Sequence, residues 1–168
     1  MTDTEKAKLD FMYKSIDDAV SNIRAMDIKS NVLIAFIGVM VFAVIKINND
    51  NISIIMALSI LCGLGTAIVF VYGVVLPRVD PDIELYNVNE IINNDLDKKL
   101  FFPRKCKNLK LYYNNINNLG YNDFLKLLSY ERLKLQIIFD KKTSYFKIGL
   151  TCLVIFFLLI LINLAAGI

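Results

Sequence analysis

Residues 31–76 read NVLIAFIGVMVFAVIKI-NNDN-ISIIMALSILCGLGTAIVFVYGVVL, and the apolar runs on either side of the NNDN break contain one charged side chain, Lys46. A helix needs about 20 apolar residues to cross the hydrocarbon core of a bilayer, with a range of about 17 to 25. Both runs, 31–47 and 52–76, fall within that range. Because only four residues separate them, we expect the two helices to form a transmembrane hairpin.

A third apolar run covers residues 146–168 and carries one charge, Lys147. The alternative to three membrane spans is a soluble domain with three buried helices. That alternative leaves too little polar sequence to cover the core, because 56% of the 168 residues are hydrophobic and the mean hydropathy is +0.51. We therefore expect an all-α integral membrane protein with three transmembrane helices, an amphipathic N-terminal helix and a small, mainly helical cytoplasmic module.

The distribution of basic residues predicts the orientation of the spans. Thirteen of the nineteen Lys and Arg residues lie from Arg78 to Lys147, five lie within residues 1–30, and the NNDN loop has none. Basic residues in short loops are retained on the cytoplasmic side. The expected protein is therefore multi-pass in the cell (inner) membrane, with a cytoplasmic N-terminus, a cytoplasmic segment 77–145 and the C-terminus outside.

Residues 1–30 have the pattern of an amphipathic helix. Thr4 or Asp3 is expected to cap its start, and no Pro or Gly interrupts the sequence before Gly38, so the helix should continue into the first span. Its apolar residues are spaced three and four apart, as in a coiled-coil seam: Leu9, Met12, Ile16, Ala19, Ile23 and Met26. The seam needs a partner, either the helix that leads into the third span or a second copy of the chain.

Residues 77–145 form the expected cytoplasmic sensor module. Pro77 and Pro81 are expected to end the second span, and Asn122 or Asp123 to cap a long helix that enters the third span, residues 146–168, without a break. Its apolar stripe comprises Phe124, Leu128, Leu135, Ile138 and Tyr145. A module of this size buries little apolar surface by itself, so we expect it to pack on the N-terminal helix.

A basic and aromatic segment lies within this module. Its cations are Lys98, Lys99, Arg104, Lys105, Lys107 and Lys110, and its aromatic residues are Phe101, Phe102, Tyr112 and Tyr113. Cations suit a phosphate and aromatic faces suit a stacked base, as in a nucleotide. The same composition suits a patch that binds anionic lipid at the membrane surface. The composition does not distinguish a nucleotide-binding site from a lipid-binding patch.

The residue inventory argues against an enzyme. The chain has no histidine, and no G-x-S-x-G or Walker pattern occurs. The three cysteines, Cys62, Cys106 and Cys152, have neither disulfide nor metal-ligand spacing. We expect no catalytic residues, no metal site and no binding of nucleic acid.

The stretch Asp27-Ile28-Lys29-Ser30 lies at the start of the first span. Further stretches along the chain are Pro77-Arg78, Leu111-Tyr112-Tyr113-Asn114-Asn115-Ile116, Tyr121-Asn122-Asp123-Phe124-Leu125, and Lys141-Lys142 followed by Tyr145-Phe146-Lys147. Together they resemble the transmembrane effectors of Pycsar antiphage systems, in which a D-x-K-[AS] signature opens the first span. The order and spacing of these stretches cover nearly the whole chain.

The resemblance implies a membrane effector of antiphage defence. A partner cyclase would make a cyclic pyrimidine mononucleotide, cUMP or cCMP, on infection, and the activated effector would disrupt the inner membrane and arrest growth. Arg104, Lys105 or Lys107 would then bind the phosphate, and Tyr112 or Tyr113 would stack on the base. A holin-like or toxin-like pore former that needs no ligand, and a lipid-binding scaffold, are the alternatives.

Two further sets of residues are expected to have functional roles. Asp27 and Lys29 lie where the N-terminal helix meets the membrane, and the resemblance implies that they couple ligand binding to the spans, with Asp27 contacting a cytoplasmic basic residue. Ser59, Gly63 and Ala67 are small and spaced four apart, a pattern that lets helix backbones approach closely. We expect a homo-oligomer that packs partly through this small-residue face.

Overall fold

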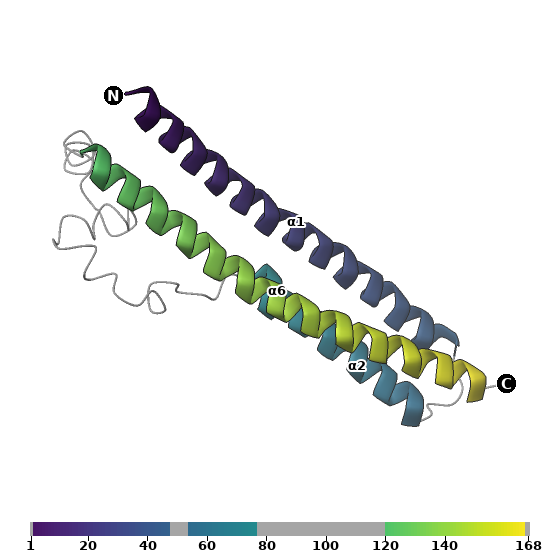
Figure 1. The fold of residues 1–168 in the computed structure, drawn as a ribbon. Helices are drawn as coiled ribbons and strands as arrows, with labels where there is room; N and C mark the ends of the chain where they lie inside the picture. The colour runs from purple at the N-terminus through teal and green to yellow at the C-terminus, as the bar shows by residue number, and fades with distance from the viewer. Residues whose placement is uncertain (1, 48–53, 77–119, 167–168) are drawn as a thin grey trace, which may run out of the picture. The chain divides into compact units, whose positions relative to one another are not determined.

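The computed structural model describes residues 2–47, 54–76 and 120–166. Its elements are α1 (Asp3–Ile47), α2 (Ile54–Phe70), the π-helix η1 (Val71–Val75) and α6 (Tyr121–Ala166) (Figure 1). Three helical stretches are long and apolar enough to cross a membrane: α1, α2 with η1, and α6. The expected all-α membrane protein with three spans is confirmed. The greater part of the expected module, residues 77–119, lies outside the described residues.

The chain divides into two compact units. The first unit comprises residues 1–20 and 80–137, and the second comprises residues 21–79 and 138–168. Both α1 and α6 begin in the first unit and end in the second. The second unit contains all the residues of α2 and η1, and it therefore holds the membrane-spanning bundle.

The start of α1 is fixed by a reciprocal pair of hydrogen bonds. The backbone N–H of Thr2 donates to Glu5 Oε2 at 2.7 Å, and the N–H of Glu5 donates to Thr2 Oγ1 at 3.3 Å. This is a capping box, in which two otherwise unpaired helix-terminal donors are satisfied. The expected cap at Asp3 or Thr4 is therefore wrong by one or two residues: the cap is Thr2, because Glu5 lies three positions after it.

In the first unit, α1 packs on the beginning of α6. Tyr121 Oη donates to the carbonyl of Glu5 at 3.1 Å, and Arg132 Nε donates to Ser15 Oγ at 2.7 Å. These contacts join residues 116 and 117 positions apart, so the two helices run parallel here. The seam residues in this unit are buried or half-buried: Leu9, Met12, Ile16 and Ala19. Of the two partners considered for the seam, the structure shows the helix that leads into the third span.

In the second unit, α1, α2 and α6 enclose an apolar core. The buried core residues are Ile37, Val44, Met56, Phe70, Val74, Leu153, Phe156 and Ile160. The outer faces of the same helices are also apolar, since Val39, Leu61 and Leu161 are each more than half exposed. Water would disfavour such a surface, whereas lipid chains solvate it. This pattern agrees with a membrane-embedded bundle.

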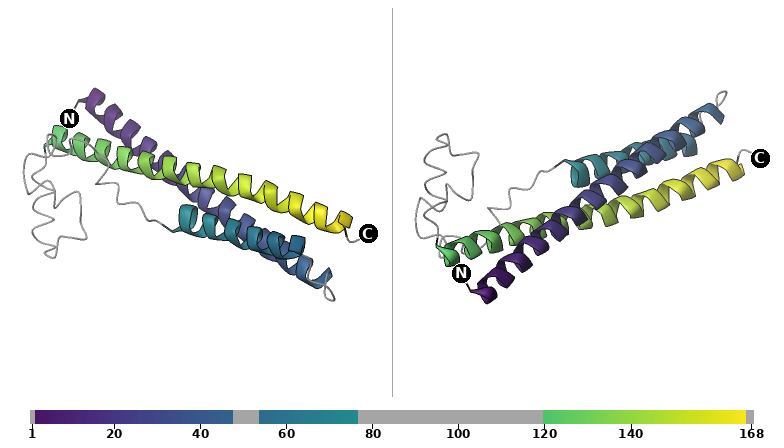
Figure 2. Two further views of the ribbon diagram at one scale, coloured as in Figure 1. Left: turned by 90° about the horizontal axis from the view of Figure 1, so that it is seen from below. Right: turned by 90° about the horizontal axis from the view of Figure 1, so that it is seen from above.

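Glycines allow α2 and α6 to approach closely. A Cβ atom added at Gly63 would lie 2.7 Å from Val41 Cγ2 and 2.8 Å from Phe156 Cε2, and one added at Gly149 would lie 2.7 Å from Phe70 Cζ. The pairing of Gly63 with Phe156 and of Phe70 with Gly149 shows that α2 runs antiparallel to α6. Figure 2 shows α2 alongside the second half of α6.

The second span ends in a π-helical turn. The N–H of Leu76 donates to the carbonyl of Val71 at 2.9 Å, and Leu76 itself is extended, with φ −82° and ψ 120°. A residue before proline is disfavoured in the helical region and favoured in the extended one. The helix therefore ends at Val75, two residues before Pro77.

Alanine substitutions at Gly63 and Gly65, both on α2, test the glycine packing described above. Gly63→Ala must displace Val41 or Phe156, and overpacking of this kind costs about 1–3 kcal/mol. Gly65→Ala meets nothing within 4 Å, so it should be neutral or stabilise by about 0.5–1 kcal/mol through helix propensity. Unfolding in mild detergent with added sodium dodecyl sulfate, followed by circular dichroism, measures both. Equal effects of the two variants would contradict the packing described here.

Candidate functional site

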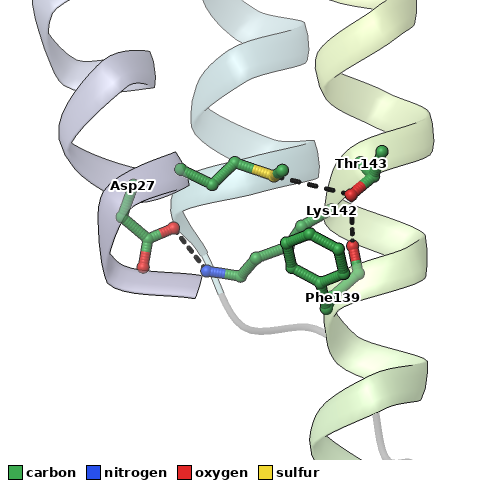
Figure 3. Close-up of polar contacts among 5 residues, drawn as sticks. Asp27, Phe139, Lys142 and Thr143 are labelled. Atoms are coloured by element: carbon green, nitrogen blue, oxygen red, sulfur yellow. Dashed lines mark hydrogen bonds and ion pairs between the residues drawn. The ribbon is translucent and has the colours of Figure 1, made fainter. Parts of the chain in front are cut away.

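An ion pair joins α1 to α6 in the second unit. Lys142 Nζ lies 2.5 Å from Asp27 Oδ1, and it donates a hydrogen bond to that carboxylate (Figure 3). Asp27 lies four residues before the first apolar run, which begins at Asn31, and Lys142 lies four residues before the third, which begins at Phe146. The pair therefore lies at the level where both helices enter the apolar bundle.

Burial makes this pair important for the packing of the two helices. The Lys142 side chain is only 8% exposed, whereas that of Asp27 is 32% exposed. An ammonium group removed from water needs a partner, because its desolvation costs several kcal/mol. Asp27 supplies the opposite charge, and the two charges together hold α1 and α6 in one register. The contact of Asp27 with a basic residue that the sequence predicts is made with Lys142.

The surroundings of the pair are partly polar. Thr143 Oγ1 donates to the carbonyl of Phe139 at 2.8 Å and lies 4.0 Å from Met26 Sδ (Figure 3). Ser30 lies one helical turn after Asp27, is fully buried, and its hydroxyl has no hydrogen-bond partner in the part of the chain that the structure describes. A buried hydroxyl without a partner costs about 1–3 kcal/mol. This arrangement of α1 and α6 is therefore not the most favourable one for Ser30.

The other predicted site residues fall in different places. Lys29 is exposed on α1, and it does not share the buried surroundings of Asp27. The expected ligand-binding residues lie outside the described residues: Arg104, Lys105, Lys107, Tyr112 and Tyr113. Their role stays a prediction from the sequence.

The small-residue face of α2 packs within the chain. Ser59 is fully buried, and its Oγ donates to the carbonyl of Met56 at 2.8 Å. Gly63 lies against Val41 and Phe156, and Ala67 packs partly buried against the same core. In this structure the face brings α2 close to α1 and α6 of its own chain, so a second copy would have to approach through another surface. Oligomerisation itself stays a prediction.

Sequence reasoning did not identify Lys142 as the partner of Asp27. The signal available was the pair Lys141-Lys142 just before the third run, but adjacent residues on a helix point in directions about 100° apart. Only the register of α6 against α1 determines which lysine reaches Asp27. Two contacts report that register. One joins Met26 and Thr143, which are 117 positions apart, and the other joins Asp27 and Lys142, which are 115 positions apart.

Comparison with known proteins identifies one family. A family model described as the Pycsar effector protein domain matches residues 11–167. The match includes the ion pair, α2 with η1, α6, and α1 from residue 11 onward. No curated protein and no solved structure matches the chain.

The ion pair is tested by a double-mutant cycle. Asp27→Leu leaves a buried, uncompensated ammonium group and should destabilise the fold, whereas Asp27→Leu combined with Lys142→Met removes both charges and should recover most of the loss. The expected coupling free energy is about 1–3 kcal/mol, measured by unfolding in detergent.

Lys29→Met is the control for this cycle, since it removes an exposed lysine two residues from Asp27. It should change the free energy of unfolding by less than about 0.5 kcal/mol. Additive effects of the Asp27 and Lys142 substitutions would show that the pair does not contribute to stability.

Proposed function

The chain belongs to the Pycsar effector protein domain family and is a membrane effector of antiphage defence, and on this basis we propose that a cyclic pyrimidine mononucleotide, cUMP or cCMP, triggers it. In this proposal a partner cyclase makes the nucleotide on infection. The activated effector then disrupts the inner membrane and arrests growth. It acts by changing conformation in the bilayer and catalyses no reaction of its own.

The observation that carries this proposal is that two helices reach from outside the bilayer into it and are joined by a buried ion pair. With 45 and 46 residues, α1 and α6 are each about 68 Å long. The hydrocarbon core takes up only about 30 Å of that length, so roughly half of each helix lies beyond it. A ligand that changes the packing of the outer halves changes the same helices that form the spans.

The proposed trigger site is the basic and aromatic segment at residues 98–113. Arg104, Lys105 or Lys107 would hold the phosphate, because charge-assisted hydrogen bonds to phosphate are stronger than neutral ones. Tyr112 or Tyr113 would stack on the pyrimidine ring. This assignment rests on the sequence and on the family to which the chain belongs.

The proposed switch is the ion pair between Asp27 and Lys142. A ligand shifts a conformational equilibrium only by its difference in affinity for the two states, so a ligand bound outside the bilayer acts on the spans only through contacts that carry the change into them. The pair supplies such a contact at the membrane entry. The buried hydroxyl of Ser30 has no hydrogen-bond partner in the described part of the chain, so a rearrangement of α1 and α6 that gives it one is less costly.

We further propose that the N-terminus and residues 77–145 face the cytoplasm. The excess of Lys and Arg in these segments supports this orientation through the positive-inside rule. Several copies would assemble in the membrane to disrupt it. Because Ser59 and Gly63 are buried within one chain, the copies would meet through the outward apolar faces of the spans.

Nucleotide binding is measured by titration calorimetry of the full-length protein in detergent. We expect cUMP or cCMP to bind and Arg104→Ala or Tyr113→Ala to weaken binding about ten- to a hundredfold, the equivalent of about 1.5–3 kcal/mol. Lys126→Ala is the matched control, since Lys126 is exposed and pairs with Asp123 on α6. If neither nucleotide binds and all single substitutions in the basic segment weaken liposome binding equally, the segment is a lipid anchor and the ligand proposal is refuted.

The coupling of ligand binding to toxicity is measured in cells that co-express the effector with its cyclase. We expect Asp27→Ala to insert into the membrane normally and to lose ligand-triggered toxicity, because α1 and α6 no longer move together. The exchanged pair, Asp27→Lys with Lys142→Asp, should restore part of the toxicity. Full toxicity of Asp27→Ala at normal expression would refute the coupling role, and toxicity without any cyclase would favour a pore former that needs no ligand.

A further inference from the structure

The seam that begins at Leu9 continues through the apolar part of α1 with the same spacing of three and four residues. Its later members are all buried or half-buried: Ser30, Leu33, Ile37, Met40 and Val44. With this spacing, a shift of α1 by about one helical turn brings each seam residue to the place of the next one. The apolar packing of α1 is therefore similar in two registers that lie one turn apart, and polar contacts decide between them.

In the first unit, the polar contact of α1 leaves a cation without an opposite charge. Arg132 donates to Ser15 Oγ at 2.7 Å and to Gln136 Oε1 at 3.0 Å, and both of these partners are neutral. The Arg132 side chain is half-buried, whereas Asp18 is exposed and lies three residues after Ser15 on α1. A shift of α1 by three residues brings Asp18 to the place of Ser15. There its carboxylate accepts a charge-assisted hydrogen bond from Arg132, which is stronger than a neutral one.

In the second unit, the same shift supplies a partner for Ser30. Ser30 lies three residues after Asp27 and is fully buried, with no hydrogen-bond partner for its hydroxyl in the described part of the chain. The shift brings Ser30 to the place of Asp27, opposite Lys142, and it brings Leu33 to the apolar place that Ser30 leaves. The Lys142 ammonium has three donors on a flexible stem. It can therefore donate to Ser30 as well as to Asp27.

A shift in the opposite direction provides neither contact. It brings Met12 to the place of Ser15, opposite Arg132, and Arg24 to the place of Asp27, opposite Lys142. An apolar side chain cannot accept a hydrogen bond, and two like charges repel. The polar residues of α1 therefore favour one direction of movement.

The hairpin packing is compatible with the favoured shift. Among the glycine contacts described above, the one that involves α1 is that of Gly63 with Val41. The shift brings Val44, which is also a buried valine, to the place of Val41. The contacts of α2 and η1 with α6, such as Phe70 against Gly149, lie on helices that keep their own register.

We propose that α1 has a second register against α6, displaced by one helical turn, or about 5 Å. In the register of this structure, Arg132 meets Ser15 and Lys142 meets Asp27. In the second register, Arg132 meets Asp18 and Lys142 reaches Ser30. Because α1 is one helix over Asp3–Ile47, the exchange of partners in the first unit and the exchange in the second occur together. The second register does not depend on the nucleotide trigger, and its test uses no nucleotide.

Disulfide cross-linking measures the two registers in membranes that contain the full-length protein. The reporter of the first register is Met26→Cys with Thr143→Cys, since these side chains are in contact. The reporter of the second is Ser30→Cys with Thr143→Cys, because Ser30 replaces Met26 after a shift of one turn. In both reporters the native cysteines are replaced by alanine: Cys62, Cys106 and Cys152. We expect both pairs to form on mild oxidation, the first faster than the second. The outward-facing pair Val32→Cys with Thr143→Cys should form far more slowly, since Val32 is 63% exposed.

Substitutions in the first unit show whether Asp18 stabilises the second register. Asp18→Asn should slow the second reporter about tenfold and leave the first unchanged, because a charge-assisted hydrogen bond is lost from one register only. Asp17→Asn is the matched control, since it removes the adjacent exposed carboxylate, which points about 100° away around the helix. Ser15→Asp combined with Asp18→Ser keeps the net charge but moves the carboxylate back by one turn, and it should also suppress the second reporter. A second reporter no faster than the Val32 pair, or equal effects of Asp17→Asn and Asp18→Asn, would overturn the proposal.

Discussion

The lack of water in the bilayer core is the constraint on which the rest of this structure depends. Every backbone N–H and C=O in that region must find its partner inside the protein, and a helix satisfies them within one segment. Within the described residues, the three apolar runs are therefore helical over 31–47, 54–75 and 146–166. The lipid also removes the hydrophobic driving force that packs helices together in water, because lipid chains are as apolar as leucine. Packing must then come from close approach and from polar contacts.

Both sources of packing are visible in the second unit. Gly63 and Gly149 bring α2 near enough to α6 for the rings of Phe156 and Phe70 to lie against their Cα positions. Asp27 and Lys142 provide the polar contact between α1 and α6. The glycine contacts are short-ranged and apolar, and the ion pair is strong only while both partners stay in register. The first kind fixes the hairpin against α6, and the second joins α1 to α6.

This division of roles bears on the proposal that the effector is inactive until a ligand triggers it. Packed cores resist continuous deformation, so the tight glycine contacts hold α2 and α6 together as a unit. An ion pair at the membrane entry adds a contact whose loss is costly but local. The hydroxyl of Ser30 lies one turn after Asp27 and has no hydrogen-bond partner among the described residues, so the local packing is not optimal for every group. Both features lie at the level where the helices enter the membrane bundle.

The sequence by itself determined the membrane class, the positions of the spans, the unbroken passage of α1 and α6 into them, and the apolar seam of α1. These depend on composition and periodicity, which are local properties of the chain. Only the tertiary structure decided the partner of the seam, the pairing of Asp27 with Lys142 instead of Lys141, and the use of Ser59 and Gly63 within one chain. Each of these depends on the register between helices more than a hundred residues apart or on which of several apolar faces pack together. Apolar faces are interchangeable in sequence, so only the simultaneous fit of all three helices selects among them.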